Sequence, residues 1–125
     1  MDFSISEEQR ALVDSVRKVC QKEFAPRAIK YLDGTWPAEN MKTLAEIGVL
    51  GMAVPPEYGG SGLGILDTVL VLEEIGKVCY VTAMAVLGEV GTQTRIISTY
   101  APESIKQKIL PRRITRSPLI VQLVL

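Results

Sequence analysis

The sequence contains no histidine among its 125 residues. That absence removes the commonest general base in enzymes and the usual catalytic triads. The only two cysteines, Cys20 and Cys79, lie far apart and match neither a Cys-x-x-Cys motif nor a zinc-binding spacing. We therefore expect reduced core thiols and no metal site, so any chemistry must come from carboxylates, a cofactor or residues outside this chain.

The sequence also lacks net charge, because 14 basic residues balance 14 acidic ones. Without a basic field or a stripe of basic and aromatic residues, nucleic acid is a poor partner. Residues 79–88 carry no charge, but this stretch is too short to span a bilayer. The N-terminus has neither the basic start nor the apolar core of a secretion signal, so we expect a cytoplasmic protein.

What the sequence does contain is a high proportion of apolar residues in a chain of single-domain size. Of its 125 residues, 47% are hydrophobic, which is more than a solitary soluble domain usually needs. We expect one hydrophobic core, together with some apolar surface that contacts a partner.

The first helix has clear start and stop signals. Ser6 and Gln9 have the spacing of a capping box, and apolar residues recur at helical intervals from there to about Phe24. Pro26 breaks or restarts the helix, and residues 33–35 predict a loop.

A short second helix and an ordered loop follow. Pro37 suits the first turn of a helix, and Gly48 is placed to stop it. Residues 50–64 hold two prolines and five glycines, which predicts a loop. Within it, residues 58–62 lack the lysine of a phosphate-binding loop, so we favour a tight turn that lets neighbouring segments pack closely.

Two longer helices are predicted next. Apolar residues surround residues 65–78, which favours a largely buried helix. A central helix is expected from about Tyr80 toward Tyr100, with Gly88 and Gly91 weakening or kinking it. Two large side chains of this helix are expected in the core: Met84 and Leu87.

The adjacent carboxylates Glu73 and Glu74 do not form an acid–base pair. On a helix, neighbouring side chains point about 100° apart, so these two cannot face each other across a substrate. We expect them to form a solvated patch or to act as cap partners for a neighbouring element.

The C-terminal stretch changes character. A short helix is expected from Pro102 to Leu110, and Pro111 follows it as a stop signal. Residues 112–118 read as a turn crowded with arginines, and residues 119–125 as an apolar strand. A lone apolar strand is an aggregation hazard, which predicts a sheet, and so a second domain, beyond it.

Five segments resemble acyl-CoA dehydrogenases in the same order and at similar spacing. Each string is weak alone, but five in register across nearly the whole chain make coincidence a poor explanation. The segments are residues 3–9 (FSISEEQ), 44–51 (LAEIGVLG), 54–62 (VPPEYGGSG), 71–76 (VLEEIG) and 106–111 (KQKILP).

The resemblance implies an all-α, up-and-down N-terminal domain of a flavoenzyme that also has a middle β-domain and a C-terminal helical domain. Residues 1–111 would form the helical domain, and residues 112–125 a linker and the first strand of the β-domain. In such enzymes a carboxylate removes the α-proton of an acyl-CoA thioester while the β-hydrogen leaves as hydride to FAD, giving a trans-2-enoyl-CoA. The carboxylate lies in the C-terminal domain, so no catalytic residue is assigned here and the 125-residue chain alone is expected to be inactive.

The resemblance also implies partners: an acyl-CoA substrate, an electron-transfer flavoprotein or similar acceptor, and assembly into homo- or hetero-oligomers through the other domains. It places Ala85, Gly88 and Thr92 on the wall of the acyl pocket, and their spacing of three and four supports a shared helix face. It places Leu123 and Leu125 against FAD. The three pocket residues are small, which favours a long or bulky acyl group, but they would equally permit close helix packing.

Two alternatives stay open at the level of the sequence. The chain could be a non-catalytic helical module that binds a partner subunit. It could also belong to a sister flavoenzyme of the same fold, such as an acyl-CoA oxidase or a flavin monooxygenase.

Overall fold

The structure, a computed structural model, describes residues 3–115, and every regular element within that range is helical. This confirms the all-α class for the described residues, whereas the expected strand at 119–125 lies outside them. The elements in chain order are α1 (Glu7–Val19), η1 (Cys20–Phe24), η2 (Ala25–Tyr31), α2 (Ala38–Glu46), η3 (Val49–Gly51), η4 (Pro56–Tyr58), α3 (Ile65–Gly76), α4 (Tyr80–Val86), η5 (Leu87–Gln93), α5 (Thr94–Tyr100) and α6 (Glu103–Thr115).

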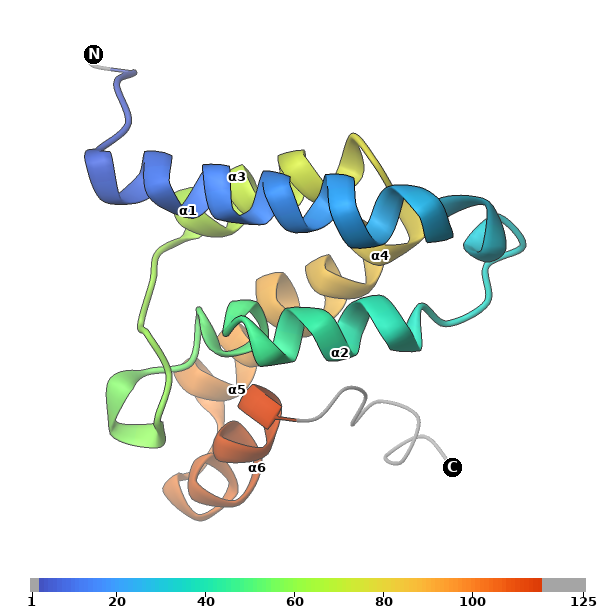
Figure 1. The fold of residues 1–125 in the computed structure, drawn as a ribbon. Helices are drawn as coiled ribbons and strands as arrows, with labels where there is room; N and C mark the ends of the chain where they lie inside the picture. Colours follow the sequence, from blue (N-terminus) through green and yellow to red (C-terminus); the bar gives the residue numbers. More distant parts are fainter. Residues whose placement is uncertain (1–2, 116–125) are drawn as a thin grey trace.

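The long helices run up and down in chain order (Figure 1). The α1 and α3 helices lie side by side and parallel, because Gln9 and Arg17 of α1 bond Asp67 and Glu74 of α3 in the same order. The α2 helix and the continuous segment α4–η5–α5 run in the opposite direction (Figure 1). The predicted up-and-down arrangement is therefore confirmed.

The start of α1 is capped as predicted. The Gln9 N–H donates to the Ser6 hydroxyl oxygen at 3.1 Å, and the Ser6 N–H donates to the Gln9 side-chain oxygen at 3.0 Å. The Gln9 amide also donates to Asp67 at 3.0 Å, and Asp67 accepts the Gly64 N–H at 2.9 Å. One short network therefore sets the starts of both α1 and α3.

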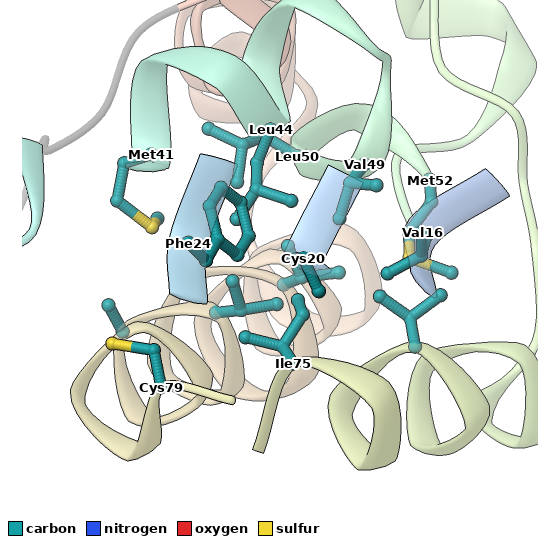
Figure 2. Packing of buried hydrophobic residues seen from close by; sticks show 14 of the residues in the cluster. Val16, Cys20, Phe24, Met41, Leu44, Val49, Leu50, Met52, Ile75 and Cys79 are labelled. Carbon is teal, nitrogen blue, oxygen red and sulfur yellow. The ribbon is translucent and has the colours of Figure 1, made fainter. Parts of the chain in front are cut away.

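The core lies between α1, α2, α3 and α4 (Figure 2). Phe24, Met41 and Leu44 are completely buried, and Ile75 of α3 packs with them. The two cysteines are free and buried, as expected. The five largest fully buried side chains come from η1, α2, α3 and α6, so the core joins segments from across the described chain.

The end of α1 shows why Pro26 changes the helix. From Cys20 the chain widens into a π-turn, in which the Ala25 N–H donates to the Cys20 carbonyl five residues earlier. A 3₁₀ segment then begins with Pro26 in its first turn, where a missing N–H costs nothing. The predicted break of the α-helix is confirmed, although a π-helical turn precedes the 3₁₀ segment that contains Pro26.

The glycine-rich loop packs closely, as the tight-turn interpretation requires. Gly48 ends α2 with φ of +85°, a conformation that L side chains rarely adopt. A Cβ built at Gly60 would lie 2.1 Å from the Val54 carbonyl oxygen. Glycine is required there because of this close approach.

The α6 helix corrects the prediction that Pro111 ends the last helix. Pro111 lies inside α6, which continues to Thr115, so Arg112 and Arg113 are helical and not in a turn. The Ile114 side chain lies against Gly51 and Gly59, within 3.3 Å of the position a Cβ would take at either glycine. This contact, made possible by small residues in the loop, favours a continued helix despite the proline.

The α3 helix corrects the prediction that residues 65–78 are largely buried. Val71 and Ile75 are buried, but Ile65, Leu66 and Val69 are each more than half exposed. One side of α3 faces the core, and the other leaves apolar side chains uncovered within residues 3–115.

Candidate functional site

The candidate site lies on the continuous helix formed by α4, η5 and α5. The predicted weakening near Gly88 and Gly91 is a π-helical segment, Leu87–Gln93. The Thr94 N–H donates to the Glu89 carbonyl five residues earlier, and the Thr94 hydroxyl donates to the same carbonyl at 2.7 Å. A π-helical turn holds one residue more than an α-helical turn. The extra residue rotates α5 relative to α4 about the helix axis.

The structure places the three residues assigned to a pocket wall in different surroundings. Apart from its chain neighbours and the backbone of its own helix, a Cβ built at Gly88 would meet no atom of residues 3–115 within 4 Å, so no other segment packs on it. Thr92 is exposed, four residues further along the π-turn. Ala85 is buried at 9% relative exposure and contacts the core. Gly88 and Thr92 therefore face outward, and Ala85 lies beneath them.

Two neighbours of these residues were expected in the core, and that prediction is wrong. Met84 is 46% exposed and Leu87 is 40% exposed. The reason is that apolar residues occupy two sides of this helix, and only the side with Val86 and Val90 faces the bundle. The outward side carries a row of exposed large side chains: Tyr80, Met84, Leu87, Ile96 and Tyr100.

We call this row, together with Gly88 and Thr92, the outer face of the central helix. Contiguous exposed apolar side chains mark surfaces that contact another molecule or domain. Composition alone had indicated surplus apolar residues, and the structure locates part of that surplus on this face. Gly88 has no side chain, so the outer face has a depression at this position.

Behind the outer face, η5 is held by a buried ion pair. Arg113 of α6 donates to the Glu89 carboxylate, and the two side chains are 3% and 5% exposed. The same guanidinium donates to the Gln93 side-chain oxygen at 2.6 Å. Burial raises the pKa of the Glu89 carboxyl, and the Arg113 charge opposes that shift. Sequence reasoning missed this pair because Arg113 was assigned to a turn.

A second buried polar chain supports the start of the same helix. The Asn40 amide donates to the Thr82 hydroxyl at 2.9 Å, and that hydroxyl donates to the Cys79 sulfur at 3.1 Å. Arg27 donates to the Asn40 side-chain oxygen at 3.2 Å. These hydrogen bonds fix α4 against α2, and none of them involves a residue of the outer face.

The two adjacent glutamates have separate roles, as their helical geometry requires. Glu73 is exposed, but Glu74 is buried and accepts two hydrogen bonds from Arg17 at 3.0 and 3.1 Å. Lys77 donates to Glu74 at 2.8 Å. The Arg17 and Lys77 bonds lower the pKa of the Glu74 carboxyl. Glu74 therefore joins α3 to α1 through a side-chain ion pair, whereas a solvated patch or a cap partner was expected.

Residues 3–115 contain no group of three potential metal-ligating side chains. Burial raises the pKa of the Cys20 thiol to about 11, which makes it unreactive. No helix in the described part of the chain is long and apolar enough to cross a membrane. The two residues assigned to FAD, Leu123 and Leu125, lie outside the described residues.

Comparison with known proteins identifies the class. Residues 6–117 match the family described as "Acyl-CoA dehydrogenase, N-terminal domain", so the chain belongs to that family. The chain is 39% identical over 117 residues to cyclohex-1-ene-1-carbonyl-CoA dehydrogenase of Syntrophus aciditrophicus, covering 93% of this chain and 28% of that protein. It is 36% identical to mitochondrial isovaleryl-CoA dehydrogenase of Bos taurus, covering 89% of this chain and 27% of that protein.

Solved structures agree with this family. A glutaryl-coenzyme A dehydrogenase in complex with glutaryl-CoA superposes with a TM-score of 0.83 at 31% identity, covering 92% of this chain and 30% of that one. The FAD complex of PigA has a TM-score of 0.79 at 24% identity, covering 92% of this chain and 31% of that one, and shows the shared fold alone. The chain spans less than a third of the length of these relatives.

Proposed function

We propose that this chain forms the acyl-pocket wall of an FAD-dependent acyl-CoA dehydrogenase, which oxidises an acyl-CoA to its trans-2-enoyl product. The observation that carries the proposal is the open space at Gly88. A glycine retained only for close helix packing would have a neighbour against it, and no described residue lies there. A small residue on an exposed apolar face instead leaves room for a ligand.

In this proposal Gly88 and Thr92 contact the acyl chain, and Ala85 lies beneath them as part of the same wall. Met84 and Leu87, four residues and one residue before Gly88 in the same continuous helix, are exposed as well. Their flexible apolar side chains suit contact with methylene groups. Because Gly88 has no side chain to fill the pocket, we expect the pocket to accept a long or bulky acyl group.

FAD supplies the hydride acceptor in the proposed enzyme. We propose that Leu123 and Leu125 contact it, as the resemblance implies. The described residues supply apolar side chains and no carboxylate on the outer face, so we assign them binding and water exclusion and no proton transfer.

We further propose an electron-transfer flavoprotein or a similar acceptor as the redox partner, an oligomeric assembly, and a cytoplasmic location. A solved structure described as the electron transferring flavoprotein of Acidaminococcus fermentans contains a chain that is 29% identical to this one, with a TM-score of 0.83. An apolar outer face that remains exposed in residues 3–115 fits a domain that is covered within a larger assembly.

The test is a fusion of residues 1–115 to the remaining domains of the Syntrophus dehydrogenase, replacing the matching part of that protein. The fusion should bind FAD and oxidise butyryl-CoA or octanoyl-CoA with an artificial electron acceptor. The unmodified Syntrophus enzyme is the positive control for FAD binding. A fusion that lacks FAD, or is yellow but inactive on every acyl-CoA tried, contradicts the proposal.

A further inference from the structure

The buried ion pair Glu89–Arg113 lies directly behind the outer face. Glu89 belongs to the π-helical segment η5, one residue after Gly88, and Arg113 belongs to α6. Both side chains are almost wholly buried, at 5% and 3% exposure. A buried ion pair is weak evidence for stability, because desolvation of two charges offsets much of their attraction. Its presence therefore needs another explanation.

The contacts of Arg113 span the π-turn. One terminal nitrogen donates to Glu89, and the other donates to Gln93 at 2.6 Å. Glu89 and Gln93 are four residues apart, so a single planar guanidinium bridges the length of the turn. The Glu89 carbonyl in the same turn accepts both the N–H and the hydroxyl of Thr94.

The turn needs such support because it is intrinsically weak. A π-turn is rare, and two of its seven residues, Gly88 and Gly91, are poor helix formers. The ordinary α-helical register would rotate the residues after the turn by roughly a quarter of a revolution or more. Ile96 and Tyr100, which follow the turn in α5, would then rotate away from the face that Gly88 occupies.

We propose that Glu89, Arg113 and Gln93 act as a positioning clamp that holds η5 in its π register and so sets the shape of the substrate-facing wall. The effect of the clamp on substrate choice rests on the proposed function. Its effect on the register of η5 does not. Because α6 supplies the arginine, the position of α6 and the register of the wall are coupled. The Nε atom of Arg113 and one oxygen of Glu89 have no hydrogen-bond partner within residues 3–115.

The test compares three variants. The double variant Glu89→Met with Arg113→Met removes both charges and keeps the volume, so it should fold with an unchanged or higher melting temperature. Glu89→Gln keeps an oxygen that can accept from Arg113 and should preserve the clamp. Arg17→Met with Glu74→Met removes a different interhelical ion pair, between α1 and α3, and serves as the matched control.

The first readout is hydrogen–deuterium exchange in the 125-residue chain, which requires no activity. Amides of residues 87–94 should exchange about tenfold faster or more in Glu89→Met/Arg113→Met, while Glu89→Gln and the control leave them unchanged. Unchanged exchange in the first double variant would overturn the clamp.

The second readout is the ratio of kcat/KM for octanoyl-CoA to that for butyryl-CoA in the fusion enzyme. The clamp predicts a change of about fivefold or more in Glu89→Met/Arg113→Met at equal melting temperature, and no change in the other two variants. Faster exchange with an unchanged ratio would overturn the link to substrate choice. If the unmodified fusion is inactive, the proposed function fails, and the exchange experiment alone decides whether the clamp exists.

Discussion

At the scale of single residues, the glycines of this chain lie in three different surroundings. Gly88 faces open space, Gly91 is covered by the Leu87 side chain at 3.1 Å from a built Cβ, and Gly60 would collide with the Val54 backbone at 2.1 Å. These differences depend on distant segments, so residue type alone does not reveal them.

We predict that Gly88→Ala stabilises the chain and that Gly60→Ala destabilises it. Alanine at Gly88 meets no atom and improves helix propensity, which is worth about 0.5–1 kcal/mol. Alanine at Gly60 forces the loop apart and should cost about 2 kcal/mol or more. Urea unfolding monitored by the fluorescence of the single tryptophan, Trp36, measures both. A destabilised Gly88→Ala variant would mean that Gly88 is a packing contact after all.

Glu74 should make the stability of the chain depend on pH. Its pKa is lowered in the folded chain, so its contribution is present above its ordinary pKa of 4.5 and is lost as the pH falls below that value. Glu74→Gln should therefore cost about 1 kcal/mol at pH 7 and much less near pH 3, since Arg17 and Lys77 are half exposed. Unfolding curves of both proteins at the two pH values give the difference. A cost that is equal at both would show that the Glu74 charge is not involved.

At the scale of elements, the sequence predicted the start of α1 and the end of α2 better than the internal geometry of the later helices. The Ser6–Gln9 capping box and the Gly48 stop are local signals, and both are confirmed. The π-turn at Leu87–Gln93 and the passage of α6 through Pro111 depend on tertiary contacts, which local propensity does not contain. The assignment of Gly88 to a pocket wall came from resemblance and stays a prediction, whereas the buried Glu89–Arg113 pair was not foreseen.

Continuation of α6 past Pro111 predicts a specific cost for Ile114→Ala. Ile114 packs against Gly51 and Gly59, so its truncation should cost about 1–2 kcal/mol. Ile105→Ala, at a 39% exposed position of the same helix, is the control and should cost less than half as much. Thermal melts of both variants distinguish them. Equal costs would indicate that the last turn of α6 does not dock on the loop.

At the scale of the whole molecule, residues 3–115 leave a large apolar area uncovered. Two helices contribute to it, with Leu66 and Val69 of α3 and Met84 and Leu87 of the central helix all at least 40% exposed. Soluble domains that function alone rarely carry such surfaces. The surplus apolar composition, the exposed faces and the short span relative to the family members are consistent with one another.

We predict that the isolated 125-residue chain associates with itself at micromolar concentration through the outer face. Met84→Lys with Leu87→Lys should raise the concentration needed by about tenfold, because two charges would be buried on association. Ile29→Lys with Leu32→Lys, at two highly exposed positions of the η2 region, is the matched control and should have little effect. Light scattering across a dilution series measures this. A monomeric wild-type chain, or an equal effect of both variants, would contradict the prediction.

The central claim is that Gly88 leaves space for the acyl chain, and Gly88→Leu in the fusion enzyme tests it most directly. The leucine should fill that space, so kcat/KM for octanoyl-CoA should fall by about tenfold or more relative to butyryl-CoA. The melting temperature should hardly change, because no described atom lies within 4 Å of the added Cβ. An unchanged ratio of the two kcat/KM values, together with a lowered melting temperature, would contradict the claim.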